Sequence, residues 1–341
     1  MKNSVLINGI SEMSSIGYTP NQIKRAYNFG NIGNGKGITV SIIDFFGNPY
    51  IQQNLDIFSR EFSIRNTRIN IYGKAVNNDF DFGAYIEPCV DTQWVHAVSP
   101  LANLNVIRAE SYTVNGAIRA VERALEVGTD IMLMTFQSEF SEEYLKYTDI
   151  FTGDCVFIAS AGDYGAQVNF PSCVPSCISV GGTRMEISEK GERLSEETVW
   201  SGTGGGICTY YNIPEYQEKM NGIYELTKGK RGVPDVSSLG DPDTGVSVYH
   251  SSISDKFGWY RCGGTSVSAS IVAGIIANVL SSNTDGIMHS RILEEIYNLA
   301  GGTAYTNQRN KFYDVRIGNN GRYEALRGYD LCTGLGSLIN L

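Results

Sequence analysis

Apolar residues recur along the chain in two alternating patterns, as short continuous runs and as longer helical stripes. The run at residues 37–44 is almost wholly apolar, which is typical of a strand buried on both faces of a parallel sheet. The segment 114–127 instead places its apolar residues on one helical face and stops at Gly128. Further strands are predicted at 104–108, 131–136 and 155–160, and further helices at 18–29, 51–58, 83–98 and 271–280. Repeated strand–helix units of this length predict an α/β fold with a doubly wound, mainly parallel sheet flanked by helices.

The most apolar of these helices follows a turn rich in glycine. Gly263-Gly264-Thr265-Ser266 precedes a long run of small and aliphatic residues with no breaker before Ser281. Ser266 therefore lies at a helix N-terminus, where free N–H groups and a partial positive charge lower the energy of an anion. That environment suits a serine nucleophile, although most such strings are only a serine that caps a helix after a glycine turn.

Catalysis by a serine requires a base, and histidine is the usual one. The chain has three histidines, His96, His250 and His289, and none lies in a His-Gly-Thr turn. His96 falls within the predicted helix 83–98, where packing explains it better than catalysis does. We therefore expect an acidic residue to act as the base if Ser266 is the nucleophile.

Two carboxylates in the predicted helix 83–98 are candidates for that base. Glu87 and Asp91 are four residues apart, so a helix places them on one face. Like charges at this spacing repel and tend to share a proton, which raises one pKa. Pro88 favours a position for Glu87 at the very start of the helix. The spacing is also typical of a solvated acidic edge at a helix N-terminus, so both interpretations stay open.

Two further aspartates follow predicted strands, at the carboxyl edge where α/β sheets hold their sites. Asp44 ends the run 37–44, and Asp163 follows the run 155–160 within the glycine-containing segment 161–165. The glycines beside Asp163 let a ligand approach the backbone closely. An ordinary turn aspartate between glycines is an equally good interpretation of Asp163. We interpret Asp44 as a structural or supporting residue.

Composition and charge narrow the classes of function. The chain has 341 residues, 42% of them hydrophobic, which is enough for one large α/β domain or two smaller ones. A net charge of −9 without a long basic cluster argues against nucleic acid as a partner. No run of about 18 apolar residues predicts a transmembrane helix, so we expect no membrane partner.

Four ordered motifs together resemble one family, the sedolisins, which are serine-carboxyl peptidases with a subtilisin-like fold. The segments 263–269, 87–100 and 161–165 resemble those that carry the family's nucleophile, its Glu-x-x-x-Asp pair and its oxyanion aspartate. The segment 312–337 resembles the family's calcium site. Further matches are Phe170-Pro171, 180–183, Trp200, 204–206 and 231–236. The resemblance covers essentially the whole chain and implies a single sedolisin-type catalytic domain over residues 1–341.

The resemblance implies a role for each candidate residue. Ser266 would attack the peptide carbonyl, and Glu87 would act as general base and then as acid. Asp91 would orient Glu87 and hold the shared proton, while a protonated Asp163 would donate a hydrogen bond to the oxyanion. A carboxylate base has a lower pKa than histidine and Asp163 must be neutral, so the resemblance implies an endopeptidase that acts in acid.

The resemblance also implies one structural Ca²⁺ near the C-terminal end. Asp314 and Asp330 would supply carboxylate oxygens, and Val315, Leu326 and Gly328 would supply carbonyl oxygens. A water would complete about six oxygen ligands, within the usual range for Ca²⁺. The family usually has glycine at the position of Leu326, but a carbonyl ligand tolerates a side chain if the backbone angles allow it. Without the family, these aspartates in glycine-rich loops would predict a metal only weakly.

Some residues depart from the family pattern. Ser270 stands where a proline usually follows the nucleophile motif, and Thr135-Phe136-Gln137 replaces a Ser-aromatic-Gly segment. Gln137 places a side chain near the substrate, which puts an inherited specificity in doubt. The alternatives are a tripeptidyl-peptidase of the same family and a non-catalytic relative that binds peptides. Retention of all four catalytic positions argues against the second.

Processing and location are open at this point. Family members commonly carry a long N-terminal prosegment and often a signal, and neither is seen, so the chain is either processed or built without them. We expect a monomer that acts on polypeptides. The resemblance favours an extracellular or acidic compartment. The missing apolar signal core in residues 1–30 and the odd number of cysteines, seven, leave an intracellular location open.

Overall fold

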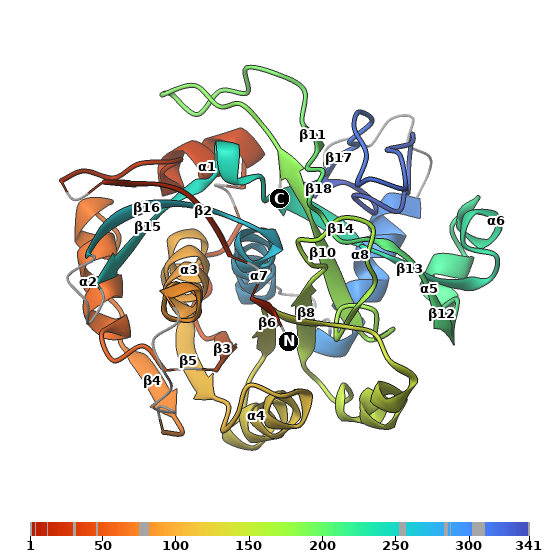
Figure 1. Ribbon diagram of the computed structural model, residues 1–341, viewed down its shortest axis with the longest axis horizontal. Coiled ribbons are helices and arrows are strands. Elements are labelled where there is room, and N and C mark those ends of the chain that lie inside the picture. The colour runs from red at the N-terminus through yellow and green to blue at the C-terminus, as the bar shows by residue number, and fades with distance from the viewer. Residues whose placement is uncertain are drawn as a thin grey trace.

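The computed structural model is built on one large sheet whose strands run mainly parallel (Figure 1). It describes residues 2–3, 5–11, 13–29, 32–45, 47–74, 82–251, 257–282, 286, 288–301 and 311–339. The strands of this sheet are β3 (Thr39–Asp44), β4 (Ile69–Tyr72), β5 (Asn103–Arg108), β6 (Ile131–Met134), β8 (Val156–Ser160), β10 (Cys177–Arg184), β11 (Thr198–Val199), β14 (Val236–Leu239), β17 (Phe312–Tyr313) and β18 (Ser337–Leu338). Their order is β17-β18-β14-β10-β8-β6-β3-β5-β4, and β11 pairs with β10. Of the described strand pairs within this sheet, β10–β11 and β17–β18 are antiparallel and the others parallel, which confirms the predicted fold class.

Helices cover both faces of the sheet because side chains along each strand alternate between the faces. In β3, Val40 and Ile42 face one apolar core and Ile43 faces the other. The first core also takes side chains from α1 (Pro20–Tyr27), α2 (Ile51–Glu61), α3 (Phe82–Val98), α7 (Thr265–Ser281) and α8 (Ile292–Gly301). The second takes them from α4 (Val114–Val127). No helix of the described segments combines the length and apolarity that a membrane span requires.

Smaller sheets lie beside the large one. Within the described residues, β1 (Lys2–Asn3), β7 (Phe136–Glu139) and β9 (Asn169–Phe170) form one of them, with β7 in the middle. A second has β16 (Phe257–Gly263) between β15 (Val246–Ser251) and β2 (Leu6–Ser11). A third pairs β12 (Gly206–Asn212) with β13 (Lys230–Val233). The remaining short helices are α5 (Glu215–Glu218), α6 (Ile223–Thr227) and the 3₁₀ helices Glu142–Ile150, Pro242–Thr244 and His289–Arg291.

Two predicted elements differ from the structure at positions that matter for function. The segment 131–136 is predicted as one strand, but the strand is interrupted at Thr135. β6 ends at Met134, and β7 begins at Phe136. α3 contains Pro88 in its interior, so the prediction that Glu87 lies at the start of the helix is wrong. The helix continues past Pro88 because its neighbours, including the fully buried Trp94, pack into the core, and tertiary packing outweighs one lost backbone hydrogen bond.

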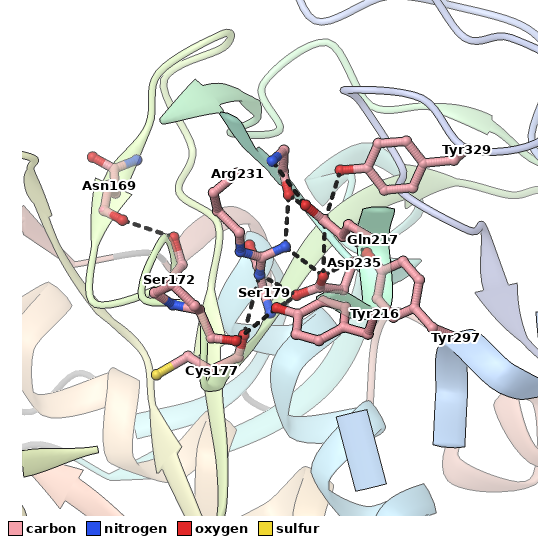
Figure 2. A network of polar contacts seen from close by, with 12 residues as sticks. Asn169, Ser172, Cys177, Ser179, Tyr216, Gln217, Arg231, Asp235, Tyr297 and Tyr329 are labelled. Atoms are coloured by element: carbon pink, nitrogen blue, oxygen red, sulfur yellow. Dashed lines mark hydrogen bonds and ion pairs between the residues drawn. The ribbon is translucent and has the colours of Figure 1, made fainter. Parts of the chain in front are cut away.

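A buried ion pair ties β13 to the start of β14 (Figure 2). Both terminal nitrogens of Arg231 donate to Asp235, at 2.7 Å to Oδ1 and 2.6 Å to Oδ2, and both side chains are fully buried. The Tyr297 hydroxyl of α8 donates to Oδ1 at 2.7 Å, and the Ser179 N–H of β10 donates to Oδ2 at 2.8 Å. Gln217 donates to the Tyr297 hydroxyl at 2.8 Å. One carboxylate therefore connects α5, α8, β10 and β13.

We predict that Asp235→Asn destabilises the fold by about 3–5 kcal/mol, because it leaves the Arg231 charge buried without its counter-ion. The free energy of unfolding in urea measures the loss. Glu126→Gln breaks the exposed ion pair between Glu126 and Arg123 and should cost much less. Equal losses in the two variants would contradict the assignment of Asp235 as the connecting group.

Candidate active site

The N-terminus of α7 fixes the position of Ser266. Gly264 caps the helix with a φ of 106°, a conformation that L side chains rarely adopt. A Cβ on Gly263 would lie 2.4 Å from the Pro242 nitrogen, so this position also requires glycine. Ser266 is fully buried, and its Oγ donates a long hydrogen bond, 3.4 Å, to the carbonyl oxygen of Thr135. The hydroxyl is thus held only weakly where β6 ends and β7 begins.

One face of α7 packs directly against α3. Residues Ser266, Ser270, Gly274 and Asn278 are spaced by four and share that face. Asn278 donates to the Val98 carbonyl at 2.9 Å, and a Cβ on Gly274 would lie 2.5 Å from the Val98 Cβ. This close contact sets the register that brings the first turn of α7 beside the acidic residues of α3.

Glu87 lies beside Ser266 in this register. Both of its carboxylate oxygens are buried, and neither makes a hydrogen bond of normal geometry with the described residues. Burial raises the pKa of Glu87 well above its usual range, and the nearby Asp91 charge raises it further. The hydroxyls of Ser266 and Thr135 lower this pKa, so both are close enough to stabilise the carboxylate. Glu87 is therefore an acceptor without a firm partner next to a serine hydroxyl.

Asp91 is held from two sides by hydroxyl groups. The Thr135 Oγ1 donates to Oδ2 at 2.7 Å, and the Ser270 Oγ donates to Oδ1 at 2.8 Å. Burial nevertheless raises the pKa of Asp91 to about 7, since the two hydroxyls lower it only in part. These partners are the residues at which the sequence departs from the family pattern. Ser270 has one signal in the sequence, its place one turn after Ser266 in a helix of mostly small and aliphatic residues, and Thr135 has none.

Asp163 approaches the start of α7 from the end of β8. Its Oδ1 accepts hydrogen bonds of 2.8 Å from both the N–H and the hydroxyl of Thr265. Its Oδ2 is buried without a partner among the described residues. Burial raises the pKa of Asp163 to about 7. When protonated, Asp163 therefore has an O–H to donate next to Ser266. Gly162 permits this approach, because a Cβ there would lie 2.2 Å from Oε1 of Gln137.

The five residues predicted to hold calcium lie around one C-terminal loop. The Gly328 N–H donates to Asp314 at 3.0 Å, and the Leu326 N–H donates to Asp330 at 3.1 Å. Val315 is fully buried, and no hydrogen bond from the described residues reaches its carbonyl oxygen. No group of three or more His, Cys, Asp or Glu side chains in the described segments is placed to share a metal. Any cation here would depend on carbonyl oxygens as well as the two carboxylates.

The chain was compared with known families and structures. The model of the subtilase family matches residues 71–313. The chain belongs to the subtilase family. It is 26% identical over 95% of its length to kumamolisin from Bacillus sp. (strain MN-32), of which the match covers 62%. It is 31% identical over half of its length to sedolisin from Pseudomonas sp. (strain 101), of which the match covers 29%.

A solved structure agrees with these matches. Pseudomonas sedolisin, a serine-carboxyl proteinase complexed with two molecules of pseudo-iodotyrostatin, superposes with a TM-score of 0.81 at 23% identity. The superposition covers 95% of this chain and 96% of that one. The fold is therefore that of sedolisin, and the resemblance to the sedolisins within the subtilases is confirmed. The chain spans less than two thirds of the length of these curated relatives.

The three histidines of this subtilase contact residues other than Ser266. His96 hydrogen-bonds the Arg65 carbonyl at 2.7 Å, and burial lowers the pKa of His96. Burial lowers the pKa of His250 to about 4, so this side chain stays neutral over most of the pH range. His289 lies 3.4 Å from Asp130 near the surface. The described residues thus offer Ser266 carboxylates and no histidine as a base.

Two further residues complete the surroundings of the carboxylates. Asp44 is buried at the end of β3, lies 3.9 Å from Arg108 and raises the pKa of Asp91. This position agrees with the supporting role predicted for it. Gln137 is buried, and both of its amide atoms lack partners among the described residues. A peptide that reached Gln137 would find both a donor and an acceptor.

The buried Asp163 predicts a stability that falls as the pH rises. Its pKa is raised from about 4 when unfolded to about 7 when folded, so the native state binds the proton more tightly. The resulting contribution to the free energy of unfolding is fully present below pH 4 and is lost as the pH rises through 7. Asp163→Asn cannot ionise, so its free energy of unfolding relative to wild type should rise by up to about 4 kcal/mol between pH 4 and 7.

Urea unfolding of both proteins at several pH values measures this difference. Asp149→Asn changes an exposed carboxyl and should show no such trend. A pH-independent difference between Asp163→Asn and wild type would mean that Asp163 is not desolvated in the folded protein.

Proposed function

We propose that this chain is a serine-carboxyl endopeptidase that acts in acid. The observation that carries the proposal is that two carboxyl groups near Ser266, Glu87 and Oδ2 of Asp163, are buried without a hydrogen-bond partner among the described residues. One site suits a proton acceptor and the other a hydrogen-bond donor, and a peptide bond attacked by Ser266 needs both.

The proposed reaction follows from these positions. The Ser266 Oγ attacks the substrate carbonyl carbon while Glu87 accepts its proton. The tetrahedral oxyanion is stabilised by the protonated Asp163 and by the N-terminal dipole of α7. Glu87 then gives the proton to the leaving amine, and water hydrolyses the ester on Ser266 by the same steps. The hydroxyls of Thr135 and Ser270 stabilise the Asp91 carboxylate against the effect of burial. The Glu87–Asp91 pair can then carry a single shared proton, which leaves it able to accept the proton of Ser266.

Acid activity follows from the protonation of Asp163. The pKa of this group is raised to about 7, so its O–H is present below that pH and is lost above it. The substrates are polypeptides, as the peptidase fold suggests. A tripeptidyl mode of cleavage is the alternative, because the chain is also 23% identical, over 90% of its length, to tripeptidyl-peptidase 1 of Dictyostelium discoideum.

We also propose one structural Ca²⁺ in the C-terminal loop, held by Asp314, Val315, Leu326, Gly328 and Asp330. The donors fit a hard cation, since all are oxygen ligands: two carboxylates and the carbonyl of the buried Val315, which no hydrogen bond from the described residues reaches. The bound ion would join the segment before Arg316 to the loop that leads into β18, and its role would be to stabilise the fold.

The first prediction for activity concerns Ser266. With an unfolded protein as substrate, kcat/KM should be highest in acid and fall as the pH rises through about 7. Ser266→Ala should lower kcat at least about 10⁴-fold, because the nucleophile is lost. Asp163→Ala should lower it about 10²–10³-fold, the usual cost of one oxyanion donor.

Ser268→Ala is the matched control for these variants. Ser268 is a buried serine in the same turn of α7, but its Oγ donates to the carbonyls of Ser238 and Leu239 in β14. Its activity should stay within a few-fold of wild type. Mass spectrometry of the products separates endopeptidase from tripeptidyl cleavage. A rate maximum near neutrality would contradict the carboxylate base.

Calcium should raise the melting temperature of the chain, since a ligand that binds only the folded state stabilises that state. At a calcium concentration 100 times its Kd, the free energy of unfolding should increase by about 2.7 kcal/mol. A chelator should reverse the effect. Asp330→Asn should abolish the response, whereas Asp149→Asn should keep it. Calcium-independent melting of wild type, by calorimetry with and without chelator, would contradict the site.

A further inference from the structure

The position of Asp163 limits where one residue of a substrate can lie. In the proposed reaction, Asp163 donates a hydrogen bond to the oxygen of the attacked carbonyl. The acyl residue is the substrate residue that owns this carbonyl, and its Cα lies about 2.4 Å from the oxygen because both atoms are bonded to the same carbon. The side chain of the acyl residue therefore starts close to Asp163 and to the preceding residue, Gly162.

Two amide side chains already occupy the space beside Gly162. A Cβ on Gly162 would lie 2.2 Å from Oε1 of Gln137 and 2.3 Å from Nδ2 of Asn169. These distances are shorter than real Cβ contacts, so both amides lie directly against the glycine. Gln137 and Asn169 are also buried. We call this arrangement of the three residues the Gly162 contact.

The strands β7 and β9 place both amides at this contact. The two strands pair antiparallel, with Glu139 opposite Asn169. Side chains two residues apart on a strand share a face, so Gln137 lies on the same face as Glu139 and Asn169. Nδ2 of Asn169 donates to the Ala161 carbonyl at 2.8 Å, which holds this amide beside Gly162. Gln137 is thus enclosed by backbone on one side and by a fixed amide on another.

A cavity of about 610 Å³ lies close to the Gly162 contact. Its lining includes Glu139 and Val168, which lie two residues after Gln137 and next to Asn169. Four aromatic side chains also line it, those of Phe140, Tyr164, Tyr210 and Tyr323. The protein therefore has room for a large side chain in this region, but the place where such a side chain would start is filled.

We propose that Gln137 is a specificity-determining residue that restricts the acyl residue of the substrate to glycine or alanine. This inference rests on the proposed function and names its substrate class. Glycine brings only a hydrogen atom to the Gly162 contact, so its carbonyl can reach Ser266 and Asp163 while both amides stay in place. A larger side chain would have to displace Gln137 from a closely packed position.

The amide of Gln137 adds a polar reason for the same preference. Both of its amide atoms are buried without a hydrogen-bond partner among the described residues. A buried polar group without a partner is unfavourable, and a peptide backbone offers both a donor and an acceptor. A glycine that comes close to Gln137 can satisfy this amide with its own peptide groups, whereas a bulky side chain keeps the backbone away.

The specificity test starts with an unfolded protein that the full chain digests in acid, and mass spectrometry identifies the residue before each cut. Peptides that copy the best-cleaved site are then made with glycine, alanine, leucine or phenylalanine as the acyl residue. For wild type, kcat/KM should fall at least about 10²-fold from the glycine peptide to the phenylalanine peptide. Equal values for these two peptides would overturn the proposal and leave the proposed function standing.

Substitutions of Gln137 test whether its volume sets the preference. Gln137→Gly should raise kcat/KM for the phenylalanine peptide about 10²-fold, because the ring can then enter beside Gly162. Gln137→Met has a similar volume and no amide, so glycine should stay preferred. Ser138→Gly is the matched control, since it adds a glycine to β7 on the opposite face, where the Ser138 Oγ lies 3.1 Å from the Tyr144 hydroxyl. A gain in either of these two variants as large as in Gln137→Gly would overturn the assignment.

A binding test separates this proposal from the proposed function. It uses the Ser266→Ala variant and fluorescent trialanine peptides that end in glycine or phenylalanine, so that the last residue takes the acyl position. Adding Gln137→Gly should raise the affinity for the phenylalanine peptide at least about tenfold and change that for the glycine peptide much less. Unchanged affinities would overturn the proposal. If the shift appears but no variant that retains Ser266 hydrolyses peptides at any pH, the proposed function fails and the role of Gln137 stands.

Discussion

The close packing of α3 against α7 is the contact on which the candidate site depends. Gly274 permits this contact, since a Cβ there would lie 2.5 Å from the Val98 Cβ. Steps of four residues then carry the register along α7 to Ser270, which bonds Asp91, and to Ser266. A larger side chain at position 274 would separate the helices and admit water to the carboxyls. The acid–base properties of the site thus originate about two turns away from the nucleophile.

Burial has opposite consequences for two aspartates of this protein. Asp235 is buried with Arg231, and two short hydrogen bonds compensate its charge. Asp163 is also buried, but no cation of the described residues forms an ion pair with it, and burial raises its pKa to about 7. The first arrangement holds secondary structure together, whereas the second lowers stability near neutrality. The proposed oxyanion donor needs that second arrangement, because only a protonated carboxyl has an O–H to give.

The sequence indicates the sheet, its flanking helices and the four candidate catalytic residues, because buried strands and amphipathic helices leave strong periodic signals. It does not show the break at Thr135, since one threonine within an apolar run is compatible with a continuous strand. It also misplaces Glu87, because Pro88 is a local signal that core packing outweighs. The hydroxyl partners of Asp91 come from different elements, and only the fold brings Thr135 and Ser270 to one carboxylate.

The N-terminal pairing is equally invisible in the sequence, because a two-residue strand has no period and β2 buries neither face. Such an exposed apolar edge normally invites pairing with other chains. Gln137 in β7 lies close to Gly162, the neighbour of Asp163, and its amide atoms have no hydrogen-bond partner among the described residues. We expect this amide to contribute to substrate selectivity, because a peptide that reached it would meet both a donor and an acceptor.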